Sequence, residues 1–266
     1  MRLAISSKQG TRSTKPPACG LGSKAAADSR FDKYKREKPH PVRKPDIKEN
    51  KALKALKEAW QSFKYFSDDD DFELEIDHNY TEATKLTRIS YTPYDIQLFV
   101  ISLAEFQDEE HFSLKAGIFL SALINNGRGS SYIIDVTHLS EKISYLGYLN
   151  NKTIKVVGNV DISLGEAMRT CSIVLEGNAG DFTGCDMSGG NLVIKGNAGQ
   201  NIGHGMFGGI IIANGSVSNE VGQYMEGGEI HINGDLSSLG KDIKGGKIYH
   251  KGELISGKEE YSEPTK

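Results

Sequence analysis

The sequence predicts a mainly β protein: a right-handed parallel β-helix of about five 19-residue coils, preceded by a small α+β cap and a basic N-terminal tail. The first observation is a ladder of glycines spaced 19 residues apart, with one final interval of 18. A second glycine ladder keeps the same spacing. A fixed period of this length indicates a solenoid, in which stacked units complete a core that one unit cannot bury alone. The ladders are Gly158/Gly177/Gly196/Gly215/Gly234/Gly252 and Gly165/Gly184/Gly203/Gly222/Gly240.

The second observation is alternation of polar and apolar residues between the glycines, which is typical of strands. In 229–233, Ile230 and Ile232 point to one side and His231 to the other. The pattern lacks the Leu-x-x-Leu-x-Leu signature of leucine-rich repeats, so a parallel β-helix is favoured, roughly 24 Å tall at the strand spacing. The five inward columns are Ile154/Ile173/Leu192/Ile211/Ile230/Ile248, Val156/Leu175/Ile194/Ala213/Ile232, Val160/Ala179/Ala198/Val217/Leu236, Leu164/Thr183/Ile202/Val221/Leu239 and Met168/Met187/Met206/Met225/Ile243.

Composition and charge limit the broad class. The chain has 266 residues and a net charge of -3, but residues 1–50 carry a balance of +8 and the remainder -11. No apolar run of 18 residues and no signal-peptide pattern occur, so we expect a cytoplasmic protein with no membrane partner. Three cysteines are too few and too irregular for a disulfide framework or a four-ligand zinc site.

The basic tail, residues 1–46, is rich in Lys, Arg, Ser and Pro, and its composition predicts disorder. Nucleic-acid binding through this tail is one hypothesis. A tail that is solvated or docked on the acidic body is favoured, because aromatic residues are sparse there.

The cap, residues 47–130, begins with an amphipathic helix predicted over 47–66, in which apolar residues such as Trp60 recur at helical spacing. The acidic run 68–71 is interpreted as a solvated turn, because it lacks the glycine and the downstream glutamate of a calcium loop. Short strands are predicted at 72–76 and 86–91.

Two more helices complete the predicted cap. Thr92 is the expected N-cap and Pro93 the first residue of a helix that carries 96–105. A second helix starts near Ser113 and ends at 125–127, where Gly127 is expected to form a left-handed stop.

The β-helix is expected over 131–255, followed by a polar tail, 256–266. Segments 132–136 and 143–149 lead into the repeats and are interpreted as a degenerate first coil, because the end units of a solenoid must face water. His250 aligns with the inward Ile232 at the other end and is expected to act as a capping residue.

The segment 203–208 spells Gly-x-Gly-x-x-Gly, the pattern of a dinucleotide-binding turn. Its glycines belong to the repeat, and no helix is expected after it. We therefore expect this chain to bind no cofactor.

One polar column combines a thiol with an imidazole. Cys185 and His204 both follow a glycine of the second ladder, and adjacent coils place them about 5 Å apart. This spacing suits a metal ligand pair or a thiolate–imidazole pair. No third ligand or orienting group is apparent, so the two residues are weak candidates for a metal or catalytic site, and no catalytic residue is assigned.

Another outward column is apolar over much of its length. Apolar residues on the outer face of a sheet indicate that something covers them, either the helices of 47–130 or another subunit. We expect the helices, because their apolar faces need a partner. This column, the outer stripe, consists of Val174, Val193, Ile212, His231 and Tyr249.

The coils 177–190 and 196–209, together with 225–228, resemble the GXGXG β-helix domain family. This domain ends the large subunit of glutamate synthase and forms one of the subunits of formylmethanofuran dehydrogenase. The resemblance covers about two-fifths of the chain. It implies a right-handed β-helix that holds catalytic domains or subunits together and has no catalytic residues of its own. The amidotransferase and flavin-binding regions of glutamate synthase have no room upstream, and the Tyr-Arg-Gly-type insertion of the dehydrogenase subunit is missing.

These observations favour a non-catalytic scaffold or subunit that docks partner proteins, within an oxidoreductase complex similar to those of the two families. The alternative is an enzyme or metal-binding protein that uses Cys185 and His204. The sequence leaves the oligomeric state open, and nucleic acid is not an expected partner.

Overall fold

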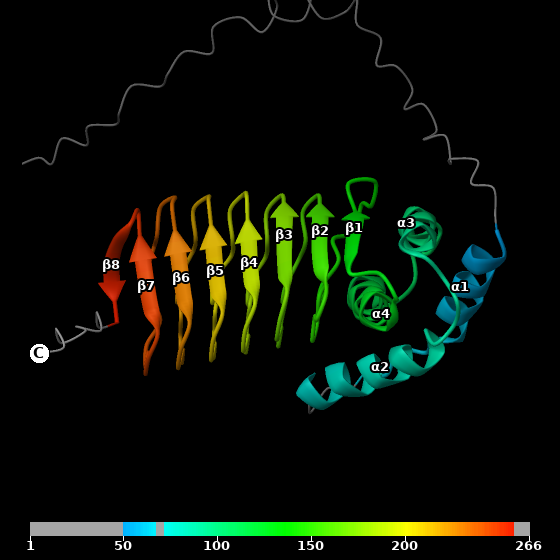
Figure 1. Cartoon of the computed structure of the whole chain (residues 1–266), viewed down its shortest axis with the longest axis horizontal. Helices are drawn as coiled ribbons and strands as arrows, with labels where there is room; N and C mark the ends of the chain where they lie inside the picture. The colour runs from blue at the N-terminus through cyan, green and yellow to red at the C-terminus, as the bar shows by residue number, and fades with distance from the viewer. Residues whose placement is uncertain (1–49, 68–71, 258–266) are drawn as a thin grey trace, which may run out of the picture. The chain divides into compact units, whose positions relative to one another are not determined.

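The repeats form a parallel β-solenoid in the computed structural model, which describes residues 50–67 and 72–257. Each coil contributes one strand to a single sheet, and the strands follow one another in chain order (Figure 1). The first seven strands pair in parallel, and the eighth pairs antiparallel with the seventh. The strands are β1 Ser131–Asp135, β2 Thr153–Val157, β3 Ser172–Glu176, β4 Asn191–Ile194, β5 Ile210–Ala213, β6 Glu229–Ile232, β7 Lys247–His250 and β8 Glu253–Ser256.

The segment 131–149 is a genuine first coil, as predicted. β1 pairs in register with β2, and Tyr145, Gly147 and Leu149 adopt φ of 60°, 81° and 53°. The next coil bends in the same way. Gly165, one coil above Gly147, also has a positive φ, of 69°. The described part of the solenoid therefore has seven parallel strands, β1 to β7, joined by six pairings, whereas the glycine ladders alone count about five coils.

The predicted inward columns form the core. The strand positions of the first two columns are buried along β2 to β6, and the four methionines have 0% exposure. Leu236, Leu239 and Ile243 are only partly buried, because they belong to the last coil and have no further coil above them.

The methionine column also explains the paired glycines. A Cβ on Gly190 would lie 2.6 Å from Cε of Met168, and one on Gly209 would lie 2.6 Å from Cε of Met187. Each methionine methyl group thus fills the space that the glycine of the next coil leaves open. The same relation holds for Met206 with Gly228 and for Met225 with Gly246.

Within the described residues, the regular elements of the cap are all helices. Its helices are α1 Lys51–Ser62, α2 Phe72–Leu86, α3 Pro93–Ser102, the 3-10 turn η2 Leu103–Glu105 and α4 Phe112–Asn126. α1 confirms the predicted amphipathic helix: Asn50 caps it by accepting a hydrogen bond from Leu53 N at 2.7 Å, and Trp60 is fully buried.

The two strands predicted in the cap are wrong. Residues 72–86 form α2, and 87–92 are irregular. The alternation at 72–76 is too short to distinguish the two structures, whereas Ile76, Asn79 and Ala83 are buried at helical spacing. Asn79 further fixes the helix, because its Nδ2 donates to Phe66 O at 2.6 Å and its Oδ1 accepts from Phe66 N at 2.9 Å.

α3 starts as predicted, with a capping box between Thr92 and Asp95. α4 ends at Asn126, but the left-handed stop is wrong: Gly127 has φ -65° and ψ 147°. Glycine is required there for a different reason, because a Cβ on Gly127 would lie 2.0 Å from Tyr132 Oη.

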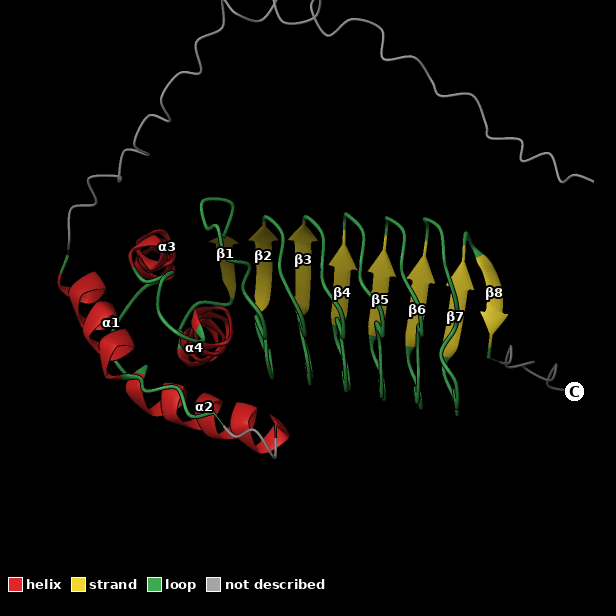
Figure 2. Ribbon diagram, turned by 180° about the vertical axis from the view of Figure 1, so that it is seen from behind, coloured by secondary structure: helices red, strands yellow, loops and turns green. Residues whose placement is uncertain are grey.

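The cap covers the first coil, and the two share one core cluster. Ser121 on α4 accepts a hydrogen bond from Gly147 N at 2.8 Å and donates to Gly117 O at 2.7 Å. Tyr148 donates to Asp77 Oδ1 on α2 at 2.5 Å. In both views the helices lie at the β1 end of the sheet (Figure 2).

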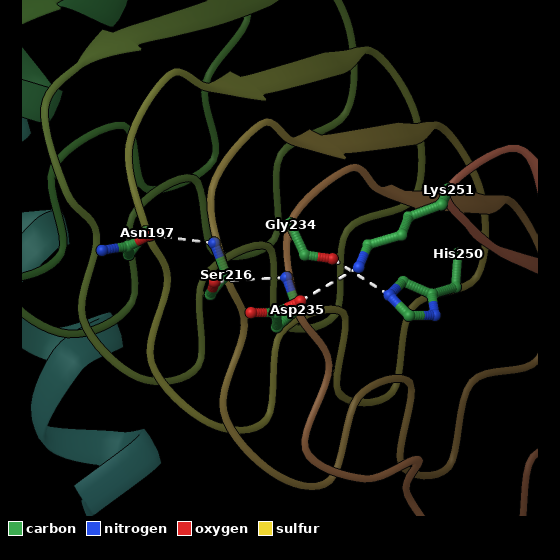
Figure 3. A network of polar contacts seen from close by, with 6 residues as sticks. All are labelled: Asn197, Ser216, Gly234, Asp235, His250 and Lys251. Carbon is green, nitrogen blue, oxygen red and sulfur yellow. Dashed lines mark hydrogen bonds and ion pairs between the residues drawn. The ribbon is translucent and has the colours of Figure 1, made fainter.

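A polar ladder links successive coils at the turns that follow β4, β5 and β6 (Figure 3). Asn197 Oδ1 accepts from Ser216 N at 2.8 Å, and Ser216 Oγ accepts from Asp235 N at 3.2 Å. Lys251 and His250 end the ladder at Asp235 Oδ1 and at the carbonyl oxygen of Gly234, 3.0 Å away in each case. His250 therefore lies at the end of the stack, as expected for a capping residue.

The predicted basic tail 1–46, the acidic turn 68–71 and most of the polar tail 256–266 lie outside the described residues.

Candidate functional site

The outer stripe runs straight across the sheet. Parallel pairing places Val174, Val193, Ile212, His231 and Tyr249 in register on β3 to β7. Their inward neighbours are buried, except His250 beside Tyr249, which is half-buried like the five stripe residues themselves. Because side chains alternate between the two faces along each strand, the stripe residues face outward, as the sequence predicts.

The prediction that the helices of 47–130 cover the outer stripe is wrong. Within residues 50–67 and 72–257, the extensive helix-to-strand packing is that of α3 on β1. The helices use their apolar faces on one another and on the end of the solenoid. Periodicity shows which residues face outward, but it carries no information on which surface a helix will cover.

The column continues beyond the stripe to Lys155 on β2 and Ile133 on β1, which is 48% exposed. Lys155 Nζ lies 3.0 Å from Glu176 Oε2, and Lys195 Nζ lies 2.6 Å from Glu176 Oε1. Hydrogen bonds from Lys195 and Lys155 hold the pKa of Glu176 below its usual value. These charges are paired beside the stripe, so its centre remains apolar.

An aromatic pair extends the other end of the stripe. The His231 and Tyr249 rings stack with centroids 4.6 Å apart and an angle of 10° between their planes. His231 Nε2 lies 3.0 Å from Glu229 Oε2. The stacked rings give this end a flat surface with a carboxylate at its edge.

Cys185 and His204 lie together, as the repeat predicts. Cys185 Sγ is 3.8 Å from His204 Nδ1 and 3.4 Å from Asp186 Oδ2. Phe182 and Tyr224 flank the imidazole edge to face, with ring centroids 5.8 and 5.4 Å away. An imidazole at this distance can accept a proton from the thiol, while the carboxylate of Asp186 competes for it.

The thiol borders a pocket of about 310 Å³ that sequence reasoning missed. Tyr145, Glu166 and Asp186 contribute to its lining, and α2 contributes Ile76. Burial, and then the charge of Glu166, raise the pKa of Tyr145. The sequence could have indicated the carboxylate, because Asp186 directly follows Cys185. The repeat could not indicate that α2 lies beside this pocket.

The structure brings together no set of metal ligands among the residues it describes: no group of three His, Cys, Asp or Glu side chains there has suitable geometry. The Gly-x-Gly-x-x-Gly segment 203–208 is part of a coil, and β5 follows it where a dinucleotide-binding turn needs a helix. A Cβ on Gly203 would lie 2.5 Å from Ile230 Cδ1, so this glycine serves the packing of coils.

Comparisons with family models, with curated proteins and with solved structures gave no match. None of the helices in the described part of the chain is long and apolar enough to span a membrane.

Proposed function

We propose that this chain is a scaffold, with no catalytic site of its own, that binds a partner protein through the outer face of its sheet. The observation that carries the proposal is the outer stripe, where Val174, Val193 and Ile212 are half-buried on a regular sheet face and the helical cap packs elsewhere. Contiguous apolar surface of this kind marks interaction sites.

The resemblance of the coils to the GXGXG β-helix domain supports the same role. In that family the β-helix holds catalytic domains or subunits together. By this resemblance, the partner is a component of a cytoplasmic oxidoreductase complex similar to glutamate synthase or formylmethanofuran dehydrogenase.

Site-specific photo-crosslinking in cells that express the full chain tests the proposal. A photoreactive residue at Val193 should give an adduct of defined mass, and the same residue at Phe207 should give none. Phe207 is a matched control because it is 56% exposed but lies outside the sheet, in the irregular segment before β5. Adding Ile212→Asp should abolish the Val193 adduct, because an unpaired carboxylate is costly to bury. Equal labelling at the two positions, or none at either, would contradict the proposal.

Thiol chemistry at Cys185 is the second candidate function. The observation that favours it is the 3.8 Å contact between Cys185 Sγ and His204 Nδ1 beside a pocket. In this alternative, His204 takes the thiol proton and the thiolate attacks an electrophilic group held in the pocket.

Alkylation rates separate the two candidates, because Cys171 is an exposed thiol in the same chain. An activated Cys185 should react with iodoacetamide at least about tenfold faster than Cys171, and His204→Ala should remove that advantage. If Cys185 reacts no faster than Cys171, the scaffold role is favoured over thiol chemistry.

A further inference from the structure

The pocket beside Cys185 lies where the helical cap meets the solenoid. α2 contributes Ile76 to its lining, and the other lining residues come from the first three coils, after their strands. Its volume of about 310 Å³ is at the lower end of the range for small-molecule sites. Such sites occur preferentially between packed units, so the position and the size of the pocket both suit a small ligand.

Three aromatic rings line the pocket. Those of Tyr145 and Tyr148 have centroids 6.3 Å apart and an angle of 63° between their planes, so together they form a corner. Phe182 lines the pocket from the third coil. Tyr148 is held by its hydrogen bond to Asp77 Oδ1 and by an edge-to-face contact with the Tyr80 ring, 5.2 Å away between centroids. This wall is therefore in place before any ligand binds.

The charged groups in the lining are carboxylates. Glu166 and Asp186 both line the pocket, and its described lining includes no Lys, Arg or His. Asp186 Oδ2 lies 3.4 Å from Cys185 Sγ, and its Oδ1 occupies the space over Gly205, where a Cβ would be only 2.3 Å away. Burial raises the pKa of Tyr145, and the charge of Glu166 raises it further. The potential in the pocket is therefore negative.

We propose that this pocket binds the ammonium group of an alkylamine. The ring faces and the two carboxylates attract the cation, and Ile76 and Ile162 give its methylene chain an apolar surface. No described residue that lines the pocket belongs to the outer stripe, so this inference goes beyond the scaffold role and does not depend on it.

Other ligand classes fit the lining less well. An anion would lie beside Glu166 and Asp186, and like charges brought together in a binding site are costly. A neutral apolar ligand would cover the exposed carboxylate of Asp186 and remove its water without supplying a counter-charge. A bare metal ion needs more ligands, and in the described part of the chain no group of three His, Cys, Asp or Glu side chains has the geometry to hold one.

Calorimetric titration of the full chain with 1,5-diaminopentane tests the proposal directly. The diamine should bind, and 1-pentanol, which has a similar chain but no charge, should not. Asp186→Asn should weaken the binding about fivefold, as expected for one partly exposed charge pair. Glu226→Gln is the matched control, because Glu226 is an exposed carboxylate that pairs with Lys244 outside the pocket, and it should leave binding unchanged. Equal binding of diamine and alcohol, or no binding of the diamine, would overturn the proposal.

Cys185 provides a second readout, because it lines the pocket. Methanethiosulfonate reagents form a mixed disulfide with a thiolate and release methanesulfinate, and they can carry an aminoethyl or a sulfonatoethyl group. The ratio of the cationic to the anionic rate cancels the intrinsic reactivity of each thiol. This ratio should be at least about tenfold higher at Cys185 than at the exposed Cys171, and Asp186→Asn should reduce it. The same ratio at both cysteines would contradict a cation site.

The ammonium group can belong to a free amine or to a lysine side chain of another protein. Titration with Nα-acetyl-lysine N-methylamide separates these sources: tighter binding than that of the diamine indicates a lysine within a polypeptide, and weaker binding indicates a free amine. Absence of binding for both probes would overturn the proposal. The photo-adduct at Val193 is measured independently, so the cation site and the scaffold role can fail separately.

Discussion

The helical cap and the solenoid bury apolar side chains in different ways. The cap is centred on the single tryptophan, Trp60, whose ring contacts those of Phe99, Phe112 and Phe119 with centroids 5.5 to 6.2 Å apart. The solenoid repeats a few modest contacts, such as the one between a methionine methyl group and a glycine of the next coil. A single side chain therefore contributes a large part of the packing of the cap core, whereas in the solenoid the packing is spread over many side chains that each contribute a little.

The largest effect is expected from Trp60→Ala. Removing a fully buried tryptophan should lower the free energy of unfolding by about 4 kcal/mol, because the aromatic rings that surround Trp60 cannot close over the cavity. Urea unfolding followed by far-ultraviolet circular dichroism measures the loss. Phe66→Ala is the matched control: Phe66 is 40% exposed and its ring lies 4.8 Å from that of His78, so its loss should be only about 1 kcal/mol. Similar losses for the two variants would show that the cap does not depend on this cluster.

The solenoid should be most sensitive where two coils approach through glycine. Gly177→Ala would place a Cβ 2.0 Å from Gly158 O, a backbone atom that cannot move without disturbing the coil beneath. We expect a loss of about 3 kcal/mol. Gly252→Ala is the control: its φ of 85° strains alanine, but no atom lies within 4 Å of the added Cβ, so the loss should be about 1 kcal/mol. Equal urea midpoints for the two variants would refute the close-approach argument.

The same contrast explains what could be predicted from the sequence. In the solenoid, a residue packs against the residues one coil before and one coil after it. Aligning the sequence at a period of 19 residues therefore predicts which side chains contact one another. The inward columns, the first coil and the meeting of Cys185 with His204 all follow from it. The paired glycines also repeat in the sequence, although their contact with methionine becomes evident only in the structure.

The cap offered no such redundancy. The alternation at 72–76 predicts a strand where the structure has a helix. The buried Asn79 side chain, which bonds to the backbone of Phe66, could not be inferred from residue spacing. The prediction that the helices cover the outer stripe was wrong for a related reason. The helices have apolar faces, but these faces pack on the first coil, at the end of the solenoid, and not on the outer face of the sheet. The pocket beside Cys185 depends on α2 and was missed for the same reason.

The smallest predicted effect concerns how the cap fixes its helix ends, and it depends on pH. Asp95 Oδ2 accepts hydrogen bonds from Thr92 N and Thr92 Oγ1, at 2.8 and 2.7 Å, and Asp95 Oδ1 accepts one from Asn50 Nδ2 at 2.8 Å, which joins α3 to the start of α1. Burial alone would raise the pKa of Asp95, but these hydrogen bonds to Thr92 and Asn50 hold it below the ordinary value of 3.8.

A carboxyl group with a depressed pKa in the folded state stabilises the fold above its unfolded pKa, and this contribution is lost as the pH falls through the folded value. Asp95→Asn should therefore cost about 1 kcal/mol near neutral pH, and the difference from wild type should shrink below a pH of about 3.8. Urea midpoints of both proteins across that range measure it. Thr92→Ala should give a similar loss at neutral pH, because it removes the other half of the same capping box. A difference between Asp95→Asn and wild type that stays constant down to the acid limit would mean that the ionised carboxylate is not what holds the start of α3.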